Sequence, residues 1–366
     1  MTDTEHQPAG PLAACDSPDE LTPEWLTAAF AAAGVDVAVE AAAVERVGTG
    51  QMGTSYRVHL GWSDPDAAAR QGAPDTVIAK MAAGPREARA IISEGYKAEL
   101  GFYTEIAATV AVRTPRCWSA TATDDCTCFT LLLEDLAPAV PGDQATGLTA
   151  AEAEDAARNL AGLHGPRWSD PELLEIAWLS RHTPETAAFY GQILDQAIPT
   201  FLERFEGWMA PQDPATLRSI PEHLTAWLMT RPERFAVIHG DYRPDNLMFP
   251  PHGAGVSAVD WQTLAVGLPG RDVGYLLATS LEPEVRRAEE HHIVEAYRLA
   301  LAEHGVAVSA EECFEDYRLG VVQGPLITVL GAVYATDPNP SSDAMFTAMI
   351  TRSLLAIRDL DPFSLL

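Results

Sequence analysis

The sequence predicts an α+β fold with a strand-rich N-terminal lobe and a mainly helical C-terminal lobe. Short apolar runs rich in β-branched and aromatic residues, as strands are, are concentrated before residue 137. Longer segments with helical periodicity dominate after it. A chain of 366 residues is long enough for two lobes with sizeable cores.

The domain boundaries follow from this shift in composition. We expect a flexible lead at residues 1–20, a first lobe at 21–137 and a second lobe at 138–366. The lead has neither a basic region nor an apolar run, unlike a signal peptide. The most apolar segment, 319–335, is short and broken by the sequence QGP, which favours a buried helix over a membrane span. We therefore expect a cytoplasmic protein without a membrane partner.

The net charge of −28 limits the classes of partner. Nucleic-acid phosphates would be repelled, so no nucleic-acid partner is expected. A cationic substrate would suit this charge, although a surplus of acidic residues also keeps proteins soluble. Five cysteines without a repeated C-x-x-C indicate reduced, structural thiols. A metal shared by Cys117, Cys126 and Cys128 is the alternative.

A glycine-rich segment at 44–62 is the first candidate for a binding site. Gly48, Gly50 and Gly53 match the pattern G-x-G-x-x-G. A Walker loop would need lysine where Thr54 stands, and a dinucleotide-binding loop would need a helix after the glycines. The residues that follow, TSYRVHL, have the character of a strand. A glycine loop between strands folds over nucleotide phosphates in kinases; a plain hairpin with a glycine-rich turn is the alternative.

Lysine is rare in this chain. Of 24 basic residues only Lys80 and Lys97 are lysines, and Lys80 lies near the end of a strand-like run at 76–81. The helical segment 86–110 places Glu99 within its apolar stripe, where a carboxylate requires a partner. We expect Lys80 and Glu99 to pair, as in the device that holds ATP phosphates in kinases. The alternative is a solvated Glu99 at the edge of the stripe.

The most informative stretch is HGDYRPDNLMF, residues 239–249. Asp241 and Asn246 have the spacing of the H-x-D-x-x-x-x-N catalytic loop of kinases. Two short apolar runs around a turn-rich connector predict a β-hairpin over 247–259. Its open end would bring Asn246 and Asp260 together as oxygen ligands for Mg²⁺. Asp241 beside them could accept the proton of an attacking hydroxyl.

At this point the chain resembles a known family. HGDYRPDN, VDWQ and RDVGYLL are similar to motifs of the aminoglycoside phosphotransferase and choline kinase superfamily, a branch of the protein-kinase-like fold. The run LLLEDL, RNLAGLHG, VIHGDYRPDNLMF and VDWQ resembles its ecdysteroid-kinase-like branch in particular. The resemblance covers roughly residues 44–280 and implies a bilobal kinase-like fold that uses ATP and Mg²⁺.

The resemblance also implies roles for individual residues. Asp241 would be the catalytic base, with Asn246 and Asp260 as Mg²⁺ ligands. Lys80, held by Glu99, would contact the α- and β-phosphates of ATP. The glycine loop would cover these phosphates. The backbone of three residues at the end of the buried strand within 128–138 would form the hinge that meets adenine: Glu134, Asp135 and Leu136.

Five further positions have two interpretations each or depart from the family pattern. Arg243 stands where protein kinases carry a phosphate-contacting lysine, and a solvated arginine is the alternative. His239 would support the loop structurally, with a chemical role as the alternative. Asp272 would hold the backbone of the catalytic loop, or else cap a helix. Trp261 and Gln262 follow the metal aspartate where the family often has Phe or Trp and then Gly or Glu, which puts a two-metal site in doubt.

The leading hypothesis is an ATP-dependent kinase of a small-molecule hydroxyl. An antibiotic-resistance phosphotransferase that modifies aminoglycoside-like drugs is the rival among enzymes. A nucleotide-binding pseudokinase that acts by interaction is the rival from another class. The retained Lys80, Asp241, Asn246 and Asp260 argue against the pseudokinase. The sequence has no recognisable code for the acceptor pocket.

Overall fold

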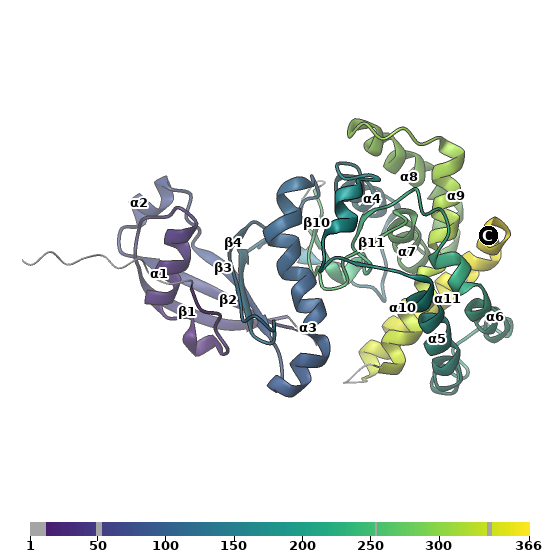
Figure 1. The fold of residues 1–366 in the computed structure, drawn as a ribbon, viewed down its shortest axis with the longest axis horizontal. Coiled ribbons are helices and arrows are strands. Elements are labelled where there is room, and N and C mark those ends of the chain that lie inside the picture. The colour runs from purple at the N-terminus through teal and green to yellow at the C-terminus, as the bar shows by residue number, and fades with distance from the viewer. Residues whose placement is uncertain (1–11, 49–52, 253–254, 335–338) are drawn as a thin grey trace, which may run out of the picture. The chain divides into compact units, whose positions relative to one another are not determined.

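The computed structural model describes residues 12–48, 53–252, 255–334 and 339–366. The chain divides into two compact units. Unit 1 comprises Met1–Thr104 and Pro115–Leu136, and unit 2 comprises Glu105–Thr114 and Ala137–Leu366. Unit 1 is rich in strands and unit 2 in helices (Figure 1). The expected α+β architecture is thereby confirmed.

Unit 1 is built around one antiparallel sheet of five strands, in the order β1-β2-β3-β5-β4. Its strands are β1 (Val39–Val47), β2 (Gly53–Trp62), β3 (Thr76–Ala82), β4 (Cys117–Ala122) and β5 (Phe129–Glu134). Its helices are α1 (Pro23–Ala32), α2 (Pro65–Arg70) and α3 (Arg86–Gly101). The core beneath α1 centres on Phe30, whose ring lies 5.0 Å from Trp62 and 5.5 Å from Trp118 between centroids. Such aromatic packing fixes α1 on the sheet.

The N-terminal lead differs from expectation. Residues 1–11 lie outside the described part of the chain, but residues 12–20 belong to the folded unit. Cys15 is buried, and its backbone N–H donates to Thr130 Oγ1 on β5 at 2.8 Å. The indole N–H of Trp25 on α1 donates to the carbonyl of Ala13 at 2.8 Å. These long-range bonds order the end of a segment that was expected to be a flexible lead.

The helix expected over 86–110 is shorter. The α-helix α3 ends at Gly101, followed by a π-turn at Phe102–Ile106 and a 3₁₀ turn at Ala107–Thr109. The chain passes from unit 1 to unit 2 between Thr104 and Glu105. Phe102 and Ile106 are both fully buried. The change from α-helical geometry at this turn accompanies their packing, and helical periodicity in the sequence did not indicate it.

Unit 2 consists of eight α-helices and two small sheets within its described residues. The helices are α4 (Ala150–His164), α5 (Pro184–Arg204), α6 (Asp213–Leu228), α7 (Gly270–Ser280), α8 (Pro283–Glu303), α9 (Ala310–Gly320), α10 (Gln323–Tyr334) and α11 (Pro340–Leu360). One sheet contains β6 (Val140–Pro141), β9 (Leu247–Phe249) and β10 (Ser257–Ala258), and the other β7 (Ser180–Arg181), β8 (Ala236–Ile238) and β11 (Ala265–Gly267). No described helix combines the length and the apolarity that a membrane span requires.

Helix α7 forms the centre of unit 2. All of its 11 residues are buried. Glycines let α9 approach it closely: a Cβ on Gly270 would lie 2.1 Å from the carbonyl oxygen of Asp316, and one on Gly320 would lie 1.7 Å from the carbonyl oxygen of Gly270. Any larger residue would push the helices apart. The result is a rigid central helix against which the polar loop at 239–246 is held.

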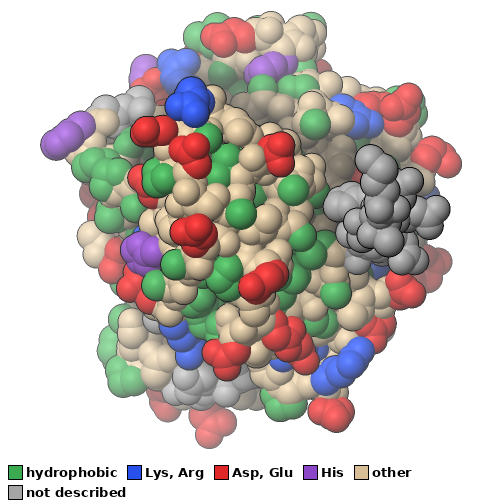
Figure 2. Space-filling model, turned by 90° about the vertical axis from the view of Figure 1, so that its left-hand side faces the viewer, with side chains coloured by type: hydrophobic (Ala, Val, Ile, Leu, Met, Phe, Trp, Pro, Cys, Tyr) green, Lys and Arg blue, Asp and Glu red, His purple; other side chains and the backbone are tan. Residues whose placement is uncertain are grey.

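Charged side chains and cysteine thiols are spread over the described residues and do not gather at one place. Figure 2 shows acidic side chains scattered among apolar ones over the face it presents. All five cysteines are free, and Cys117 and Cys126 pack against an apolar cluster of unit 1. Burial raises the pKa of the Cys117 thiol to about 12, which disfavours the thiolate that binds metal. Within the described residues no His, Cys, Asp and Glu side chains gather as a metal site, so the alternative of a cysteine metal site gains no support.

Candidate active site

The expected ion pair of unit 1 is present. Lys80 Nζ donates to Glu99 Oε1 at 2.7 Å. The side chain of Glu99 is 1 % exposed and that of Lys80 is 12 % exposed, so the solvated alternative for Glu99 is wrong. Lys80 lies opposite Ser55 on β2 and Leu131 on β5. The central strand therefore aims the ammonium at α3.

The glycine loop joins two strands, as predicted. β1 and β2 pair antiparallel, with Val47 opposite Ser55, and no helix follows the glycines. Gly48 has φ +72°, a turn conformation that glycine adopts easily, and a Cβ there would meet no other atom within 4 Å. Gly53 begins β2, whereas Gly50 lies outside the described residues. A dinucleotide-binding loop is excluded, because it would need the helix.

The three residues of the predicted hinge lie at the end of β5, the strand that closes with Glu134. Asp135 Oδ2 accepts from Arg57 Nε at 2.6 Å, and Oδ1 accepts from Arg57 Nη2 at 3.2 Å. The N–H of Glu134 donates to the carbonyl of Arg116 at 2.8 Å. The bidentate bond to Arg57 holds the Asp135 side chain in place. Leu136 is the last residue of unit 1. A hinge role for these three residues stays a prediction.

The polar loop of unit 2 leads into the expected hairpin. β9 and β10 pair antiparallel, with Leu247 opposite Ala258, and the N–H of Val259 donates to the carbonyl of Asn246 at 3.0 Å. This register places Asn246 at the open end of the hairpin, next to the strand that leads into Asp260. Asp260 itself has φ +68°, a left-handed conformation that Asp tolerates better than most residues.

Three donors surround the carboxylate of Asp241. Oδ1 accepts from the hydroxyl of Tyr275 at 2.7 Å. Oδ2 accepts from Asn246 Nδ2 at 2.9 Å. Arg243 Nε lies 3.2 Å from Oδ1 and 3.3 Å from Oδ2. The side chain is still 24 % exposed, so the carboxylate is held in one orientation while remaining accessible.

Arg243 is enclosed by carboxylates and is not a solvated arginine. Its side chain is 18 % exposed and pairs with both Asp241 and Asp245. Burial acts to lower the pKa of Arg243, but the neighbouring Asp241, Tyr275 and Asp245 together outweigh burial and the pKa is raised. The guanidinium is therefore a permanent positive charge beside the candidate base. A phosphate contact stays a prediction.

Asp272 holds the backbone of the loop at 239–246. Its Oδ2 accepts from the N–H of His239 at 2.6 Å and its Oδ1 from the N–H of Gly240 at 2.9 Å. The N-cap of α7 is Pro269, so the helix-cap alternative for Asp272 is wrong. Full burial acts to raise the pKa of Asp272, but its interactions with His164, with His239 and with the Gly240 amide together outweigh burial and keep the pKa below its usual range. The ionised carboxylate can therefore accept both amides.

His239 makes contacts that suit the structural role predicted for it. Its Nε2 lies 3.1 Å from the carbonyl oxygen of Val259, which ties the loop to the hairpin. Its ring packs 4.7 Å from Trp261 between centroids. Gly240 has φ +82°, and a Cβ there would lie 2.5 Å from the carbonyl oxygen of Thr263. The turn before Asp241 thus requires glycine.

Sequence reasoning missed four residues that contact this loop or its anchor. His164 Nε2 lies 3.2 Å from Asp272 Oδ2, and Gln323 Nε2 donates to the carbonyl of Gly240 at 2.9 Å. Arg271 holds the Gln323 side chain through two hydrogen bonds, of 3.1 and 2.8 Å. The fourth residue is Tyr275. His164, Arg271 and Tyr275 carried a signal, because they lie within the RNLAGLHG and RDVGYLL motifs, whereas Gln323 lies in neither.

Asn246 and Asp260 suit a magnesium ion. Asn246 Nδ2 donates to the backbone oxygen and to Oδ2 of Asp241, both at 2.9 Å. This orientation leaves the amide oxygen of Asn246 as a potential ligand. Mg²⁺ prefers oxygen ligands and commonly binds one or two carboxylates together with phosphates and water. An amide oxygen and the Asp260 carboxylate fit that requirement.

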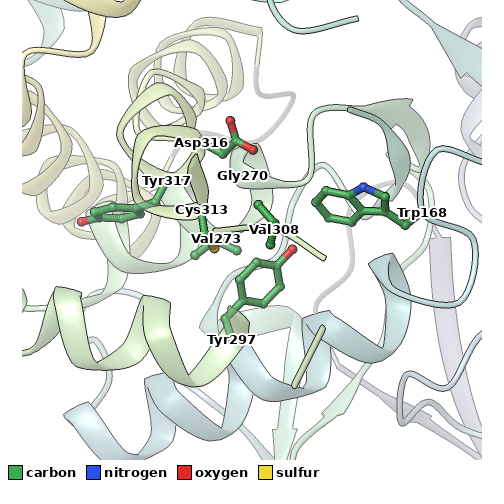
Figure 3. Close-up of a pocket in the computed structure, with 8 residues that line it drawn as sticks. All are labelled: Trp168, Gly270, Val273, Tyr297, Val308, Cys313, Asp316 and Tyr317. Carbon is green, nitrogen blue, oxygen red and sulfur yellow. The ribbon is translucent and has the colours of Figure 1, made fainter. Parts of the chain in front are cut away.

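A small cavity elsewhere in unit 2 contains none of the predicted site residues. It lies between α7, α8 and α9 and is drawn in Figure 3. Burial raises the pKa of Asp316, in its wall, to about 6. The lining residues are Trp168, Gly270, Val273, Tyr297, Val308, Cys313, Asp316 and Tyr317. Its small size and largely apolar wall make it a packing defect of the core.

Two solved structures are similar to this chain. A candidate aminoglycoside phosphotransferase from Ralstonia eutropha JMP134 is 17% identical, with a TM-score of 0.50 over 88% of this chain and 95% of that one. An ethanolamine kinase from Plasmodium vivax is 12% identical, with a TM-score of 0.49 over 87% of this chain and 84% of that one. The first of these two structures shows that this chain shares its fold, with a strand-rich N-terminal part and a helical C-terminal part.

Sequence comparison shows the family to which the chain belongs. Acyl-CoA dehydrogenase family member 10 of Mus musculus is 42% identical over 74 residues, which are 19% of this chain and 7% of that protein. The chain therefore matches only a small part of that curated relative's length. The model of the ecdysteroid kinase-like family matches residues 48–309, well over half of the chain. This protein belongs to the ecdysteroid kinase-like family.

Proposed function

We propose that the protein is an ATP-dependent phosphotransferase that transfers the γ-phosphate to a hydroxyl of a small molecule. Its family and fold support a small-molecule phosphotransferase in general terms. The observation that carries the finer proposal is the geometry around Asp241. A carboxylate held by three donors, yet accessible, lies in the same loop as Asn246, at the open end of the hairpin that leads into Asp260.

Different residues of the chain carry out different parts of the proposed reaction. Asp241 accepts the proton of the acceptor hydroxyl as its oxygen bonds to the γ-phosphorus and the bond to the departing ADP oxygen breaks. Arg243 keeps a positive charge beside Asp241. Asn246 and Asp260 would hold Mg²⁺, which neutralises charge on the phosphates when bound. Lys80, oriented by Glu99, binds the α- and β-phosphates.

Lys80 and Glu99 should act as a unit. Removing one member of a buried ion pair leaves the other charge uncompensated and costs about 3–5 kcal/mol. We therefore expect Glu99→Ala to weaken nucleotide affinity almost as much as Lys80→Ala, and the double variant to be little worse than either single one. Nucleotide titrations of the four proteins by calorimetry measure the coupling. Glu94→Ala, which removes the exposed partner of Lys97, is the matched control and should change affinity less than about twofold. Strictly additive losses would contradict a shared role.

The acceptor should be a small molecule and not a protein. Only 11 residues, WQTLAVGLPGR, separate Asp260 from Asp272, and no A-P-E element follows. This connector is itself part of a sheet, because β11 pairs with both β7 and β8. The hydroxyl of Thr263 donates to the carbonyl of His239 at 2.8 Å. A segment tied down in this way offers neither a peptide platform nor a phosphorylation switch, so constitutive activity is expected.

Labelled ATP tests the acceptor class. We expect label to be transferred to a small alcohol and not to mixed proteins or peptides, with the Asp241→Asn variant as background. The small-molecule panel should include amino alcohols, sugars, sterols and aminocyclitols, because the net charge suits a cationic acceptor and aminoglycosides are the rival substrate class. Robust labelling of peptides without any small-molecule acceptor would overturn the proposal.

A further inference from the structure

Tyr275 lies in the middle of α7 and reaches the candidate base. Its side chain is fully buried, and its hydroxyl donates to Asp241 Oδ1 at 2.7 Å. Burial, followed by the nearby Asp241 carboxylate, raises the pKa of Tyr275 well above its usual value. The phenol therefore stays protonated and remains a hydrogen-bond donor throughout the range in which enzymes work.

The hydrogen-bond donors around Asp241 occupy most of the lone pairs on which its carboxylate could accept a proton. An ionised carboxylate offers about four lone-pair sites. Tyr275 occupies one on Oδ1, Asn246 occupies one on Oδ2, and Arg243 Nε shares the two oxygens. About one site remains for an incoming hydroxyl. The donors thus select which lone pair of Asp241 can act as base.

Tyr275 lies on a different structural element from the other two donors of Asp241. Arg243 and Asn246 belong to the same loop as Asp241 and would move with it. Tyr275 belongs to the buried helix α7, which also carries Asp272, the acceptor for the loop amides of His239 and Gly240. One helix therefore fixes the loop backbone through Asp272 and the reactive carboxylate through Tyr275.

We propose that Tyr275 is a positioning residue that sets the orientation of the Asp241 carboxylate for proton abstraction, an inference that rests on the proposed phosphotransferase function. Productive geometry is demanding, because a misplacement of about 1 Å can cost about 100-fold in rate. Without the phenol, Asp241 keeps only loop donors and can rotate among orientations that do not face the acceptor.

Tyr317 provides a matched control for this role. It is also fully buried, and its hydroxyl donates to a carboxylate oxygen, Glu290 Oε2, at the same distance of 2.7 Å. That pair joins α8 and α9 and makes no hydrogen bond to the catalytic loop. Tyr→Phe at either position deletes one buried hydroxyl and leaves a similar structural defect, so only a positioning role separates the two variants.

Steady-state kinetics test the proposal. We expect Tyr275→Phe to lower kcat roughly 10- to 100-fold, with KM for ATP changed less than about twofold, because the phenol contacts the base and not the nucleotide. Tyr317→Phe should keep kcat within about twofold of the parent. Equal kcat values for the two variants would overturn the positioning role.

A second measurement does not depend on activity. A double-mutant cycle of Tyr275→Phe with Asp241→Ala, followed by denaturant unfolding, reports whether the two side chains interact. We expect the unfolding equilibrium constant to depart from additivity by about tenfold, as for a hydrogen bond to a charged group. Additive effects would overturn the inference. A measurable coupling in a protein that phosphorylates no tested acceptor would support the hold of Tyr275 on Asp241 while counting against the proposed function.

Discussion

Replacing Asp241 with Asn should reduce turnover by roughly 10²–10⁴-fold, the usual contribution of a general base. The amide has nearly the same shape but does not accept the acceptor's proton. Nucleotide affinity should change little, because Lys80 and the sheet that carries it belong to unit 1. The melting temperature should change little, because Asn fills nearly the same space as Asp. Turnover at saturating ATP, calorimetric nucleotide titration and thermal unfolding measure the three quantities separately.

The control for Asp241→Asn is the same change of charge at an exposed helix position. Asp195 lies on α5 with its side chain in solvent, so Asp195→Asn should leave turnover within about twofold. Asp241→Asn with more than half of the parent activity would remove Asp241 from the mechanism. A large fall in melting temperature would instead indicate that its three hydrogen bonds are mainly structural.

Removing the charge of Asp260 should have the largest effect on nucleotide binding in the presence of Mg²⁺. We expect Asp260→Ala to weaken magnesium-dependent binding on the order of 100-fold or more, and Asn246→Ala to weaken it less, because only Asp260 supplies a charged ligand. Calorimetric titration of nucleotide with and without Mg²⁺ isolates the metal-dependent part. Equal and negligible effects of both substitutions would contradict the metal site.

Asp260 also needs a variant that separates charge from backbone strain. Its φ of +68° is unfavourable for alanine but tolerated by asparagine. Asp260→Asn should therefore keep the melting temperature close to that of the parent and still lose most of the magnesium-dependent affinity. If only Asp260→Ala were impaired, strain at this turn would explain the loss and the ligand role would be wrong.

Several features of the site could be predicted because short stretches of sequence encode them. The β9–β10 hairpin follows from two apolar runs around a turn, and its register fixes where Asn246 lies. The pairing of Lys80 with Glu99 followed from a carboxylate on an apolar helical stripe, since burial there demands a cation and lysine is scarce. The role of Asp272 needed the family resemblance in addition.

Other features were beyond the sequence because they depend on contacts between distant residues. Residues 12–20 have no periodic pattern that indicates a helix or strand, yet the backbone N–H of Cys15 hydrogen-bonds to Thr130, 115 positions away. Gln323 lies within an apolar run and gave no hint that its amide holds the carbonyl of Gly240, 83 positions earlier. Arg243 could be read equally as solvated or enclosed, since exposure depends on what packs around it.

By itself the sequence determined the α+β architecture, the glycine loop between strands and the identity of the groups that can do chemistry. These depend on local periodicity and on residue type, which a single chain displays directly. Only the tertiary structure decided how Asp241 is oriented. Its carboxylate is aimed by Tyr275, 34 positions away on α7, and its loop is held by Asp272 on the same helix. Such orientation comes from the packing of one buried helix, which no local pattern records.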